Sequence, residues 1–335
     1  MYIVIMAGGV GQRFWPLSTP EKPKQCLELV GGVSLIQRTF QRALSLTKRD
    51  NILVMTGPRM QAAVREQLPG LPNENVIIEP SARNTAACIA LAVFSVRSKG
   101  GEKILIWPAD HHIEDMPSWN TACLSALEMA MESKSLALVG IVPDTPHTGY
   151  GHLCVSENGH RVSTFIEKPD KARAVELMAS GNVLWNAGVC TGTVSAFIGC
   201  LDRHWHNGFT QIERYFNCGD VEAWSKVEKI SFDYAVLEKM TDLSVSAYRG
   251  GWSDLGDWNA VGEQFPEIDG GRGLTALNFV HDGDGHVIYS PDKPVAILGL
   301  SDIVVIDTPN GLLVMHKDYA QDVRHASAAM EERDD

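Results

Sequence analysis

Features of secreted and membrane-bound proteins are scarce in this sequence. Its seven cysteines are an odd number without a Cys-x-x-Cys pair and stand mostly among apolar neighbours, so we predict reduced, buried thiols. The N-terminus lacks the basic segment of a signal peptide, and no apolar run reaches the roughly 18 residues of a membrane span. We therefore expect a cytoplasmic chain with no membrane partner.

Positive charge is also in short supply. Lysine and arginine number 29 against 41 aspartates and glutamates, which gives a net charge of −12. An acidic surface repels the phosphate backbone of DNA and RNA, so we expect no nucleic-acid partner. A phosphorylated substrate would need a local basic pocket within this unfavourable field.

The first half of the chain alternates short apolar runs, typical of buried strands, with longer helical patterns. The runs occupy residues 2–6, 51–55, 75–78, 103–107 and 136–141, and the helical patterns lie at about 34–48, 59–68, 84–98 and 118–133. This alternation predicts an α/β fold with a Rossmann-like, mostly parallel sheet and helices on both faces. Ligands of such folds bind beyond the carboxyl ends of the strands.

Past residue 141 the pattern becomes less regular. We expect hairpin strands at 152–155 and 161–166 and helices near 169–180, 192–204 and 231–240. A Gly- and Asp-rich stretch then leads into short strands and a final helix at about 318–332. We place a domain boundary near residue 265, between a large domain (1–265) and a small β-rich C-terminal domain with a terminal helix (266–335).

A glycine-rich segment follows the first predicted strand. Gly8, Gly9 and Gly11 let the backbone approach a ligand closely, with N–H groups free to bind phosphate oxygens. Arg13 and Lys24 would neutralise a triphosphate, although a tight turn with solvated charges is the alternative. An aromatic residue takes the place of the third glycine of a dinucleotide fingerprint, which argues against a nicotinamide dehydrogenase.

A carboxylate follows the fourth predicted strand, in the segment Pro108-Ala109-Asp110-His111-His112. Asp110 would point into the cleft, where a hard oxygen ligand suits a Mg²⁺ ion that bridges phosphates. The two histidines are contiguous, without helical ligand spacing or an evident third ligand, which argues against zinc.

Four polar residues lie at the corner between a strand and the helix at 84–98: Glu79, Arg83, Asn84 and Thr85. Asn84 or Thr85 is well placed as an N-cap, which would be a purely structural role. Capping does not account for Glu79 and Arg83 at the same corner, so we interpret the segment as part of a binding pocket.

These segments resemble the signature motifs of the sugar-phosphate nucleotidyltransferase family. The variant ending Pro23-Lys24-Gln25 is most similar to that of the mannose-1-phosphate guanylyltransferases, also called GDP-mannose pyrophosphorylases. Seven motifs occur in the family's order: Gly8–Gln25, Glu79–Thr85, Pro108–Ile113, Thr148–Gly151, Phe165–Pro169, Trp185–Gly188 and Gly251–Trp258. The resemblance covers nearly the whole chain and implies the nucleotidyltransferase fold.

The resemblance also implies roles for individual residues. The nucleotide would be held by Gly8, Gly9, Gly11, Glu79, Arg83, Asn84 and Thr85, the last four on its guanine and ribose side. The leaving diphosphate would be bound by Arg13 and Lys24, and a Mg²⁺ cofactor by Asp110 and Asp254. The sugar would be contacted by Gly149, Tyr150, Glu167 and Asn186, and its phosphate by Lys168. Asp233 is also similar to a family residue, with capping of the next helix as the alternative.

The implied reaction transfers GMP from GTP to mannose 1-phosphate, giving GDP-mannose and pyrophosphate by Mg²⁺-assisted in-line attack. The predicted catalytic residues are Arg13, Lys24, Asp110, Lys168 and Asp254. Alternatives are another nucleotide, another sugar 1-phosphate such as a manno-heptose 1-phosphate, or a catalytically silent paralogue that binds GDP-mannose and regulates a partner. A homodimer is left open. The additional isomerase domain of longer members is lacking, so we expect no mannose-6-phosphate isomerase activity.

Overall fold

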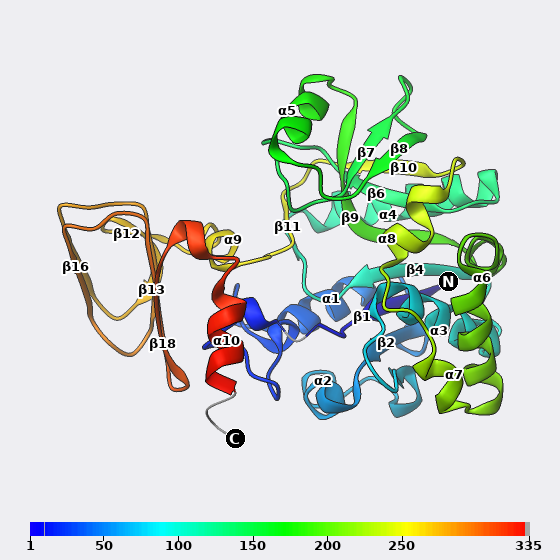
Figure 1. Cartoon of the computed structure of the whole chain (residues 1–335), viewed down its shortest axis with the longest axis horizontal. Coiled ribbons are helices and arrows are strands. Elements are labelled where there is room, and N and C mark those ends of the chain that lie inside the picture. The colour runs from blue at the N-terminus through cyan, green and yellow to red at the C-terminus, as the bar shows by residue number, and fades with distance from the viewer. Residues whose placement is uncertain (10, 332–335) are drawn as a thin grey trace.

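A nine-stranded sheet forms the centre of the computed structural model, which describes residues 1–9 and 11–331 (Figure 1). Its main path has the order β10-β6-β9-β4-β1-β2-β3. These strands are β1 (Tyr2–Met6), β2 (Ile52–Thr56), β3 (Val76–Ile78), β4 (Lys103–Pro108), β6 (Ala137–Ile141), β9 (Val183–Thr193) and β10 (Ser244–Tyr248). The neighbouring pairs are parallel except those made by β9, which is antiparallel to both β4 and β6.

Helices cover both faces of this sheet, as the alternating pattern predicts. Strand β1 shows why, because Val4 is buried in one hydrophobic core while Ile3 and Ile5 are buried in another. The first core includes residues of α3 (Asn84–Ser98), α6 (Val194–Cys218), α7 (Val221–Ser225) and α8 (Phe232–Ala235). The second includes residues of α1 (Leu35–Leu44), α2 (Gln61–Gln67) and α4 (Met116–Ser133). The predicted α/β fold class is thereby confirmed.

Two short antiparallel units extend this framework. The predicted hairpin is confirmed as β7 (His152–Val155) and β8 (Val162–Ile166), and β7 also pairs with β9; helix α5 (Lys171–Ala179) follows. A two-stranded ribbon pairs β5 (His112–Ile113) with β11 (Trp252–Ser253). Because Asp110 precedes β5 and Asp254 follows β11, this ribbon brings the two aspartate-bearing segments together.

The C-terminal segment is built mainly of short strands. A five-stranded sheet has the order β12 (Glu267–Ile268), β13 (Gly271–Thr275), β15 (His286–Ser290), β17 (Ile303–Thr308) and β18 (Gly311–His316). A separate parallel pair is formed by β14 (Asn278–His281) and β16 (Val295–Leu298), and the helices flanking these strands are α9 (Trp258–Gly262) and α10 (Val323–Glu331). Residue 332, the end of the predicted terminal helix, lies outside the described residues.

A third hydrophobic core joins this segment to the loop that follows β1. Phe14 and Leu35 from the N-terminal part pack with Trp258, Val304 and Val323. Helix α10, red in Figure 1, accordingly lies against the blue segment after β1. The boundary near residue 265 stays a prediction, since this core extends to both sides of it.

In the part of the chain that the structure describes, seven short 3-10 helices connect these elements: η1 (Gln12–Phe14), η2 (Lys24–Cys26), η3 (Arg49–Asn51), η4 (Pro58–Met60), η5 (Asn73–Asn75), η6 (Leu237–Lys239) and η7 (Lys317–Tyr319). All seven cysteines are free, and most are buried. Among the described residues, no helix is long and apolar enough to cross a membrane.

Candidate active site

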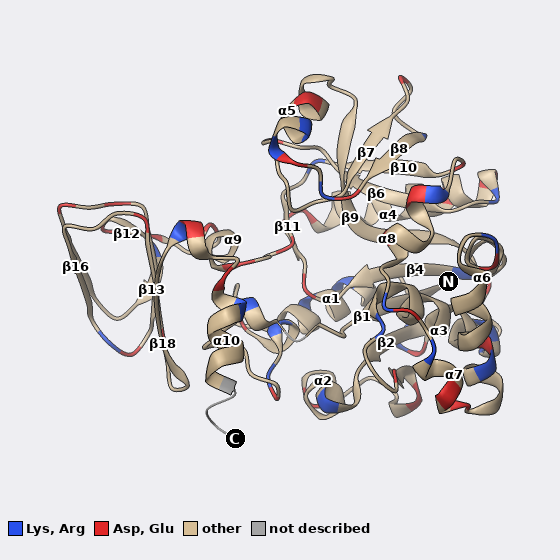
Figure 2. Ribbon diagram, in the orientation of Figure 1, with Lys and Arg blue, Asp and Glu red and all other residues tan. Residues whose placement is uncertain are grey.

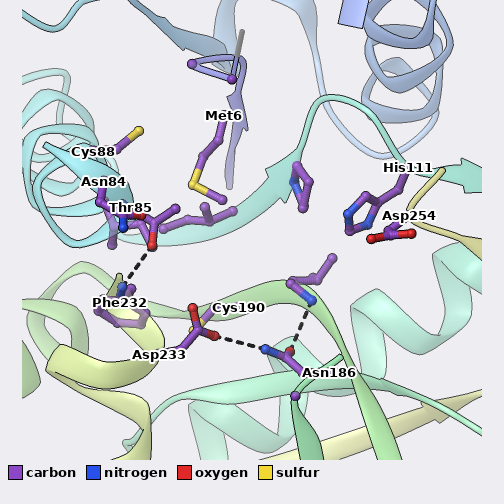
Figure 3. A pocket seen from close by; sticks show the side chains of 18 of the residues that line it. Met6, Asn84, Thr85, Cys88, His111, Asn186, Cys190, Phe232, Asp233 and Asp254 are labelled. Carbon is purple, nitrogen blue, oxygen red and sulfur yellow. Dashed lines mark hydrogen bonds between the residues drawn. The ribbon is translucent and has the colours of Figure 1, made fainter. Parts of the chain in front are cut away.

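A cavity of about 470 Å³ lies beyond the carboxyl ends of β1 and β4, where the fold class predicts a ligand (Figure 3). The predicted site residues that line it are Gly8, Gly9, Glu79, Arg83, Asn84, Thr85, Asp110, Gly149, Tyr150, Lys168, Asn186 and Asp254. Four others do not line it: Gly11, Arg13, Lys24 and Glu167. Two of these, Lys24 and Glu167, touch residues that do.

Gly11 makes room for Lys24. Its backbone has φ 72°, and an added Cβ atom would lie 2.6 Å from Cβ of Lys24. The turn is closed by Ser18, whose Oγ donates a hydrogen bond to the Gly11 carbonyl at 2.7 Å. Only glycine combines this left-handed conformation with so close a neighbour. The glycine thus positions a cation as well as exposing backbone.

Lys24 connects the two aspartates. Its Nζ donates to Oδ2 of Asp110 at 2.6 Å and to the backbone oxygen of Asp254 at 2.6 Å. It also lies 5.5 Å from the centroid of the Phe14 ring. Burial acts to raise the pKa of Asp110, but the charge of Lys24 and the Lys24 hydrogen bond bring that pKa below its usual value. Asp110 is therefore an ionised acceptor.

Asp254 is held by an aromatic cluster. The Tyr150 hydroxyl donates to Oδ1 of Asp254 at 3.1 Å. The Tyr150 ring lies 4.9 Å from that of Trp252, 5.1 Å from that of Trp185 and 3.9 Å from that of His147. Burial and the Asp254 charge raise the pKa of Tyr150, so the phenol keeps its proton and acts as a donor.

His111 lies beside the same aspartates. Trp252 Nε1 donates to its Nδ1 at 3.3 Å, which places the proton of a neutral ring on Nε2. Burial lowers the pKa of His111, against the opposite influence of Asp110 and Asp254. Sequence reasoning considered this residue only as a zinc ligand and missed it as a neutral ring in the cavity wall, because the partner Trp252 is distant in sequence.

The donor set fits Mg²⁺ better than a softer metal. Asp110 and Asp254 both line the cavity, and both contact Lys24. Carboxylate oxygens suit Mg²⁺, which usually takes one or two of them together with waters and substrate phosphates. Within residues 1–9 and 11–331, no group of three or more His, Cys, Asp or Glu residues could hold a metal ion.

Glu79 forms a buried end of the cavity wall that the motifs predict to bind the nucleotide. It is 6% exposed, and its Oε1 would lie 3.6 Å from a Cβ atom added to Gly8. Burial raises its pKa to about 7, although a hydrogen bond with Cys88 acts the other way. Arg83 donates from Nη1 to the Val227 carbonyl at 3.2 Å, which ties the corner to the segment before α8.

The N-cap interpretation of Asn84 and Thr85 is wrong. Arg83 occupies the N-cap position without a side-chain hydrogen bond, and Asn84 has a left-handed backbone with φ 67°. Thr85 Oγ1 instead accepts a hydrogen bond from the Phe232 amide at 2.8 Å (Figure 3). The Thr85 hydroxyl is therefore used in a tertiary contact with α8 instead of a local cap.

The opposite wall carries Lys168 and Asn186, and Glu167 contacts Lys168. Lys168 Nζ lies 3.0 Å from Oε1 of Glu167, and its side chain is 60% exposed against 10% for Glu167. Gly151 leaves room for that carboxylate, since an added Cβ atom would lie 2.7 Å from Oε2 of Glu167. The lysine thus remains open to a ligand while its partner is nearly buried.

Asp233 supports Asn186 rather than capping a helix. Asn186 Nδ2 donates to Asp233 Oδ1 at 3.1 Å, and Asn186 Oδ1 accepts from the Gly188 amide at 3.1 Å (Figure 3). Helix α8 is capped by Ser231, whose Oγ accepts from the Tyr234 amide at 3.3 Å. The capping interpretation of Asp233 is therefore wrong. Burial, and next the charge of Glu167, raise its pKa to about 6.

Comparison with known proteins agrees with this geometry. Residues 2–269 match the family described as nucleotidyl transferase, and residues 279–326 match the "MannoseP isomerase/GMP-like beta-helix domain". The mannose-1-phosphate guanylyltransferase of Escherichia coli is 34% identical over 342 residues, which cover 96% of this chain and 72% of that protein. The chain belongs to the nucleotidyl transferase family, in the group of mannose-1-phosphate guanylyltransferases.

Other relatives of this nucleotidyltransferase agree. The alginate biosynthesis protein AlgA of Pseudomonas aeruginosa is 34% identical over 343 residues, covering 97% of this chain and 71% of that protein. A crystal structure described as the mannose-1-phosphate geranyltransferase of Thermus thermophilus is 30% identical, with a TM-score of 0.89 over 98% of this chain and 99% of that chain. The similarity thus includes the β-rich C-terminal segment.

Arg13 is a predicted site residue of this nucleotidyltransferase that the structure does not place in the cavity wall. It is exposed. Its Nη1 donates to Oε1 of Gln321 at 3.0 Å, so its described partner belongs to the C-terminal segment. Its assignment to the leaving diphosphate stays a prediction.

Proposed function

We propose that this nucleotidyltransferase transfers GMP from GTP to mannose 1-phosphate and releases GDP-mannose and pyrophosphate. The observation that carries the proposal is the meeting of Lys24, Asp110 and Asp254 at one cavity. One wall of that cavity carries Gly8, Gly9 and the start of α3, which suit a nucleotide. The opposite wall carries Lys168 and Asn186, which suit a sugar phosphate.

The reaction needs positioning and charge more than proton transfer. A phosphate oxygen of the sugar attacks the α-phosphorus in line, and the bond to pyrophosphate breaks. That oxygen is already ionised, so no general base is required. Lys168 orients the sugar phosphate, and Lys24 places positive charge beside the reacting phosphates. Tyr150 keeps Asp254 in place by its hydrogen bond.

Asp110 and Asp254 would hold a Mg²⁺ ion, which when bound supplies Lewis-acid polarisation of a phosphoryl oxygen. Lys24 keeps Asp110 ionised and fixes the backbone of Asp254, and both effects prepare these carboxylates for a cation. The acidic residues along the segment joining β11 to α9, seen in Figure 2, include Asp254 and Asp257.

Glu79 supports the choice of guanine. The Watson–Crick edge of guanine presents N–H donors at N1 and N2, which a carboxylate accepts, whereas adenine presents an acceptor at N1. Glu79 is buried in the nucleotide wall, where a base with mismatched partners would leave a buried polar group unpaired.

A two-way substrate scan tests the proposal. GTP, ATP, dTTP and CTP are each combined with mannose, glucose and manno-heptose 1-phosphates, and pyrophosphate release is measured with Mg²⁺. We expect GTP with mannose 1-phosphate to be used at least several-fold better than ATP or dTTP with the same sugar. Equal rates with all nucleotides would remove the guanylyl assignment. Binding of GDP-mannose without any pyrophosphate release would favour the regulatory alternative.

We place this reaction in the cytoplasm, because the seven free and mostly buried cysteines suit a reducing compartment. Sedimentation of the native chain would decide between a monomer and a homodimer.

A further inference from the structure

The side-chain amide of Gln321 bridges two segments of the site. Its Oε1 accepts a hydrogen bond from Arg13 Nη1 at 3.0 Å, and its Nε2 donates to Asp257 Oδ2 at 2.6 Å. Arg13 follows the glycine-rich turn, and Asp257 lies three residues after Asp254. Gln321 itself lies between η7 and α10, 308 positions from Arg13.

An uncharged amide suits this position better than a charged side chain. It offers one acceptor to a guanidinium and one donor to a carboxylate at the same time. A carboxylate at position 321 would repel Asp257 and pair directly with Arg13. The other oxygen of Asp257 is already committed, because Oδ1 accepts from the amides of Asn259 and Ala260 at 2.9 and 3.1 Å. The orientation of Asp257 is therefore set by α9.

The C-terminal segment holds Gln321 on a rigid base. Val323, two residues on, packs in the core that contains Phe14 and Trp258. Asn310 Nδ2 donates to the Pro16 carbonyl at 3.1 Å, and Asn259 Nδ2 donates to the Lys317 carbonyl at 3.0 Å. These contacts fasten the C-terminal strands to both segments that Gln321 joins.

Helix α10 also borders the glycine-rich turn directly. A second cavity of about 470 Å³ is lined by Ser327 of α10 together with Gly8, Gln12 and Glu79. Gly8 and Glu79 line the main cavity too. The C-terminal segment therefore contributes to the surroundings of the nucleotide wall.

We propose that Gln321 is a positioning residue that holds Arg13 and the Asp254–Asp257 segment in register, so that the C-terminal domain acts as part of the triphosphate site. The proposal rests on the proposed function for its consequence in catalysis. Without the bridge, Arg13 loses its described partner, and the link that the Gln321 amide makes between Arg13 and Asp257 is gone. The loss should therefore weaken handling of GTP and leave handling of the sugar phosphate largely unchanged.

Kinetics of Gln321→Ala test this division. Loss of hydrogen bonds at this bridge should raise KM for GTP about five- to tenfold, with KM for mannose 1-phosphate changed less than about twofold. Gln321→Glu should be worse, because its charge opposes Asp257. The matched control is Asn278→Ala, which removes a hydrogen bond of 2.7 Å to the Asp269 carbonyl elsewhere in the C-terminal domain. It should leave both KM values unchanged. An equal rise in both KM values for Gln321→Ala would overturn the proposal.

A double variant separates action through Arg13 from a general weakening. Combining Gln321→Ala with Arg13→Ala should give a KM for GTP close to that of Arg13→Ala alone. Once the Arg13 guanidinium is absent, Gln321 has nothing left to position, so its removal has little further effect on this KM. If KM for GTP in the double variant rises by the product of the two single-variant factors, Gln321 does not act through Arg13.

Hydrogen exchange of the full chain without substrate gives a readout independent of activity. Gln321→Ala should speed exchange of amides in residues 11–18 and 254–259, relative to the native chain and Asn278→Ala. Unchanged exchange there would overturn the bridge itself. Faster exchange in a chain that releases no pyrophosphate from GTP and mannose 1-phosphate would support the bridge while overturning the proposed function.

Discussion

The Lys24 ammonium lies 2.6 Å from Oδ2 of Asp110, and Asp110 lines the cavity while Lys24 lies behind it, outside the lining. The lysine side chain is 9% exposed and that of Asp110 33% exposed, so the cation is covered while the carboxylate still faces the cavity. A nearly buried ammonium beside an accessible carboxylate keeps that carboxylate ionised and leaves it facing the cavity, where a cation that accompanies the phosphates can bind.

The two cleft lysines should affect different substrates. Lys24→Ala should mainly impair use of GTP and, in the reverse direction, of pyrophosphate, while Lys168→Ala should mainly weaken handling of mannose 1-phosphate. Each charge-assisted contact is worth about 1.5–3 kcal/mol, so each specific KM should change more than tenfold. Steady-state kinetics in both directions measure this. Lys293→Ala, which breaks an exposed 2.9 Å pair with Asp307, is the control. Identical losses for both substrates in both lysine variants would refute the division.

Asp254→Asn should keep the fold and lose turnover. The amide oxygen can still accept from Tyr150, but the negative charge is gone, so we expect turnover at least about a hundredfold slower with a modest loss of GTP binding. Asp110→Asn combined with it should be little worse than either single change, because the two carboxylates act as a unit. The exposed Asp292→Asn serves as control. Near-normal Mg²⁺-dependent turnover of Asp254→Asn would defeat the shared-metal arrangement.

Gly11 and Gly159 offer a comparison of backbone strain with and without a neighbour. Both have φ near +72° (72° and 73°), but only at Gly11 would a Cβ atom meet another residue, at 2.6 Å from Cβ of Lys24. Gly159→Ala should cost about 1–2 kcal/mol of stability and leave turnover unchanged. Gly11→Ala should add a more than tenfold loss of turnover, because Lys24 is displaced from Asp110. Equal turnover for the two variants would contradict this account of the turn.

The buried carboxyl of Glu79 should make stability fall as the pH rises. Its pKa is raised from 4.5 to about 7, so between these values the folded chain binds more protons than the unfolded chain. This contribution is present at low pH and is lost as the pH rises through the folded pKa. The difference between about 7 and 4.5 corresponds to roughly 3 kcal/mol. Between pH 5 and pH 7.5, urea unfolding should therefore show a larger fall in the free energy of unfolding for the native chain than for Glu79→Gln. Equal falls in the two chains would contradict this prediction.

Much of the α/β fold follows from the local patterns. Helix α3 spans Asn84–Ser98, as predicted, because its long apolar run is buried on all sides. Over residues 183–204 the structure differs from the prediction made from local patterns. A helix near 192–204 is predicted, whereas β9 continues to Thr193 and α6 then runs to Cys218 with a non-helical residue at Trp205. Antiparallel pairing of β9 with both β4 and β6 is a long-range effect that local periodicity does not report.

In the candidate site too, local sequence patterns predict some features and leave the long-range contacts undetermined. The residues placed in the cavity by motif, such as Asp110 and Asn186, do line it, because motifs at the carboxyl ends of strands share one edge of the sheet. The supporting contacts were missed. The hydrogen bond from Tyr150 to Asp254 joins residues 104 positions apart, and the hydrogen bond from Asn186 to Asp233 joins residues 47 positions apart. No rule of sequence spacing connects either pair.

The sequence by itself determined the fold class, the family and most of the predicted residues that face the cleft, because strand periodicity and short motifs are local properties of the chain. Only the tertiary structure decided that Lys24 pairs with Asp110, that Asp233 supports Asn186 and that Arg13 is held by Gln321. Each of these contacts depends on packing that brings together residues 86, 47 and 308 positions apart. Distance in space sets their electrostatic and hydrogen-bond energies, and distance along the chain does not reveal it.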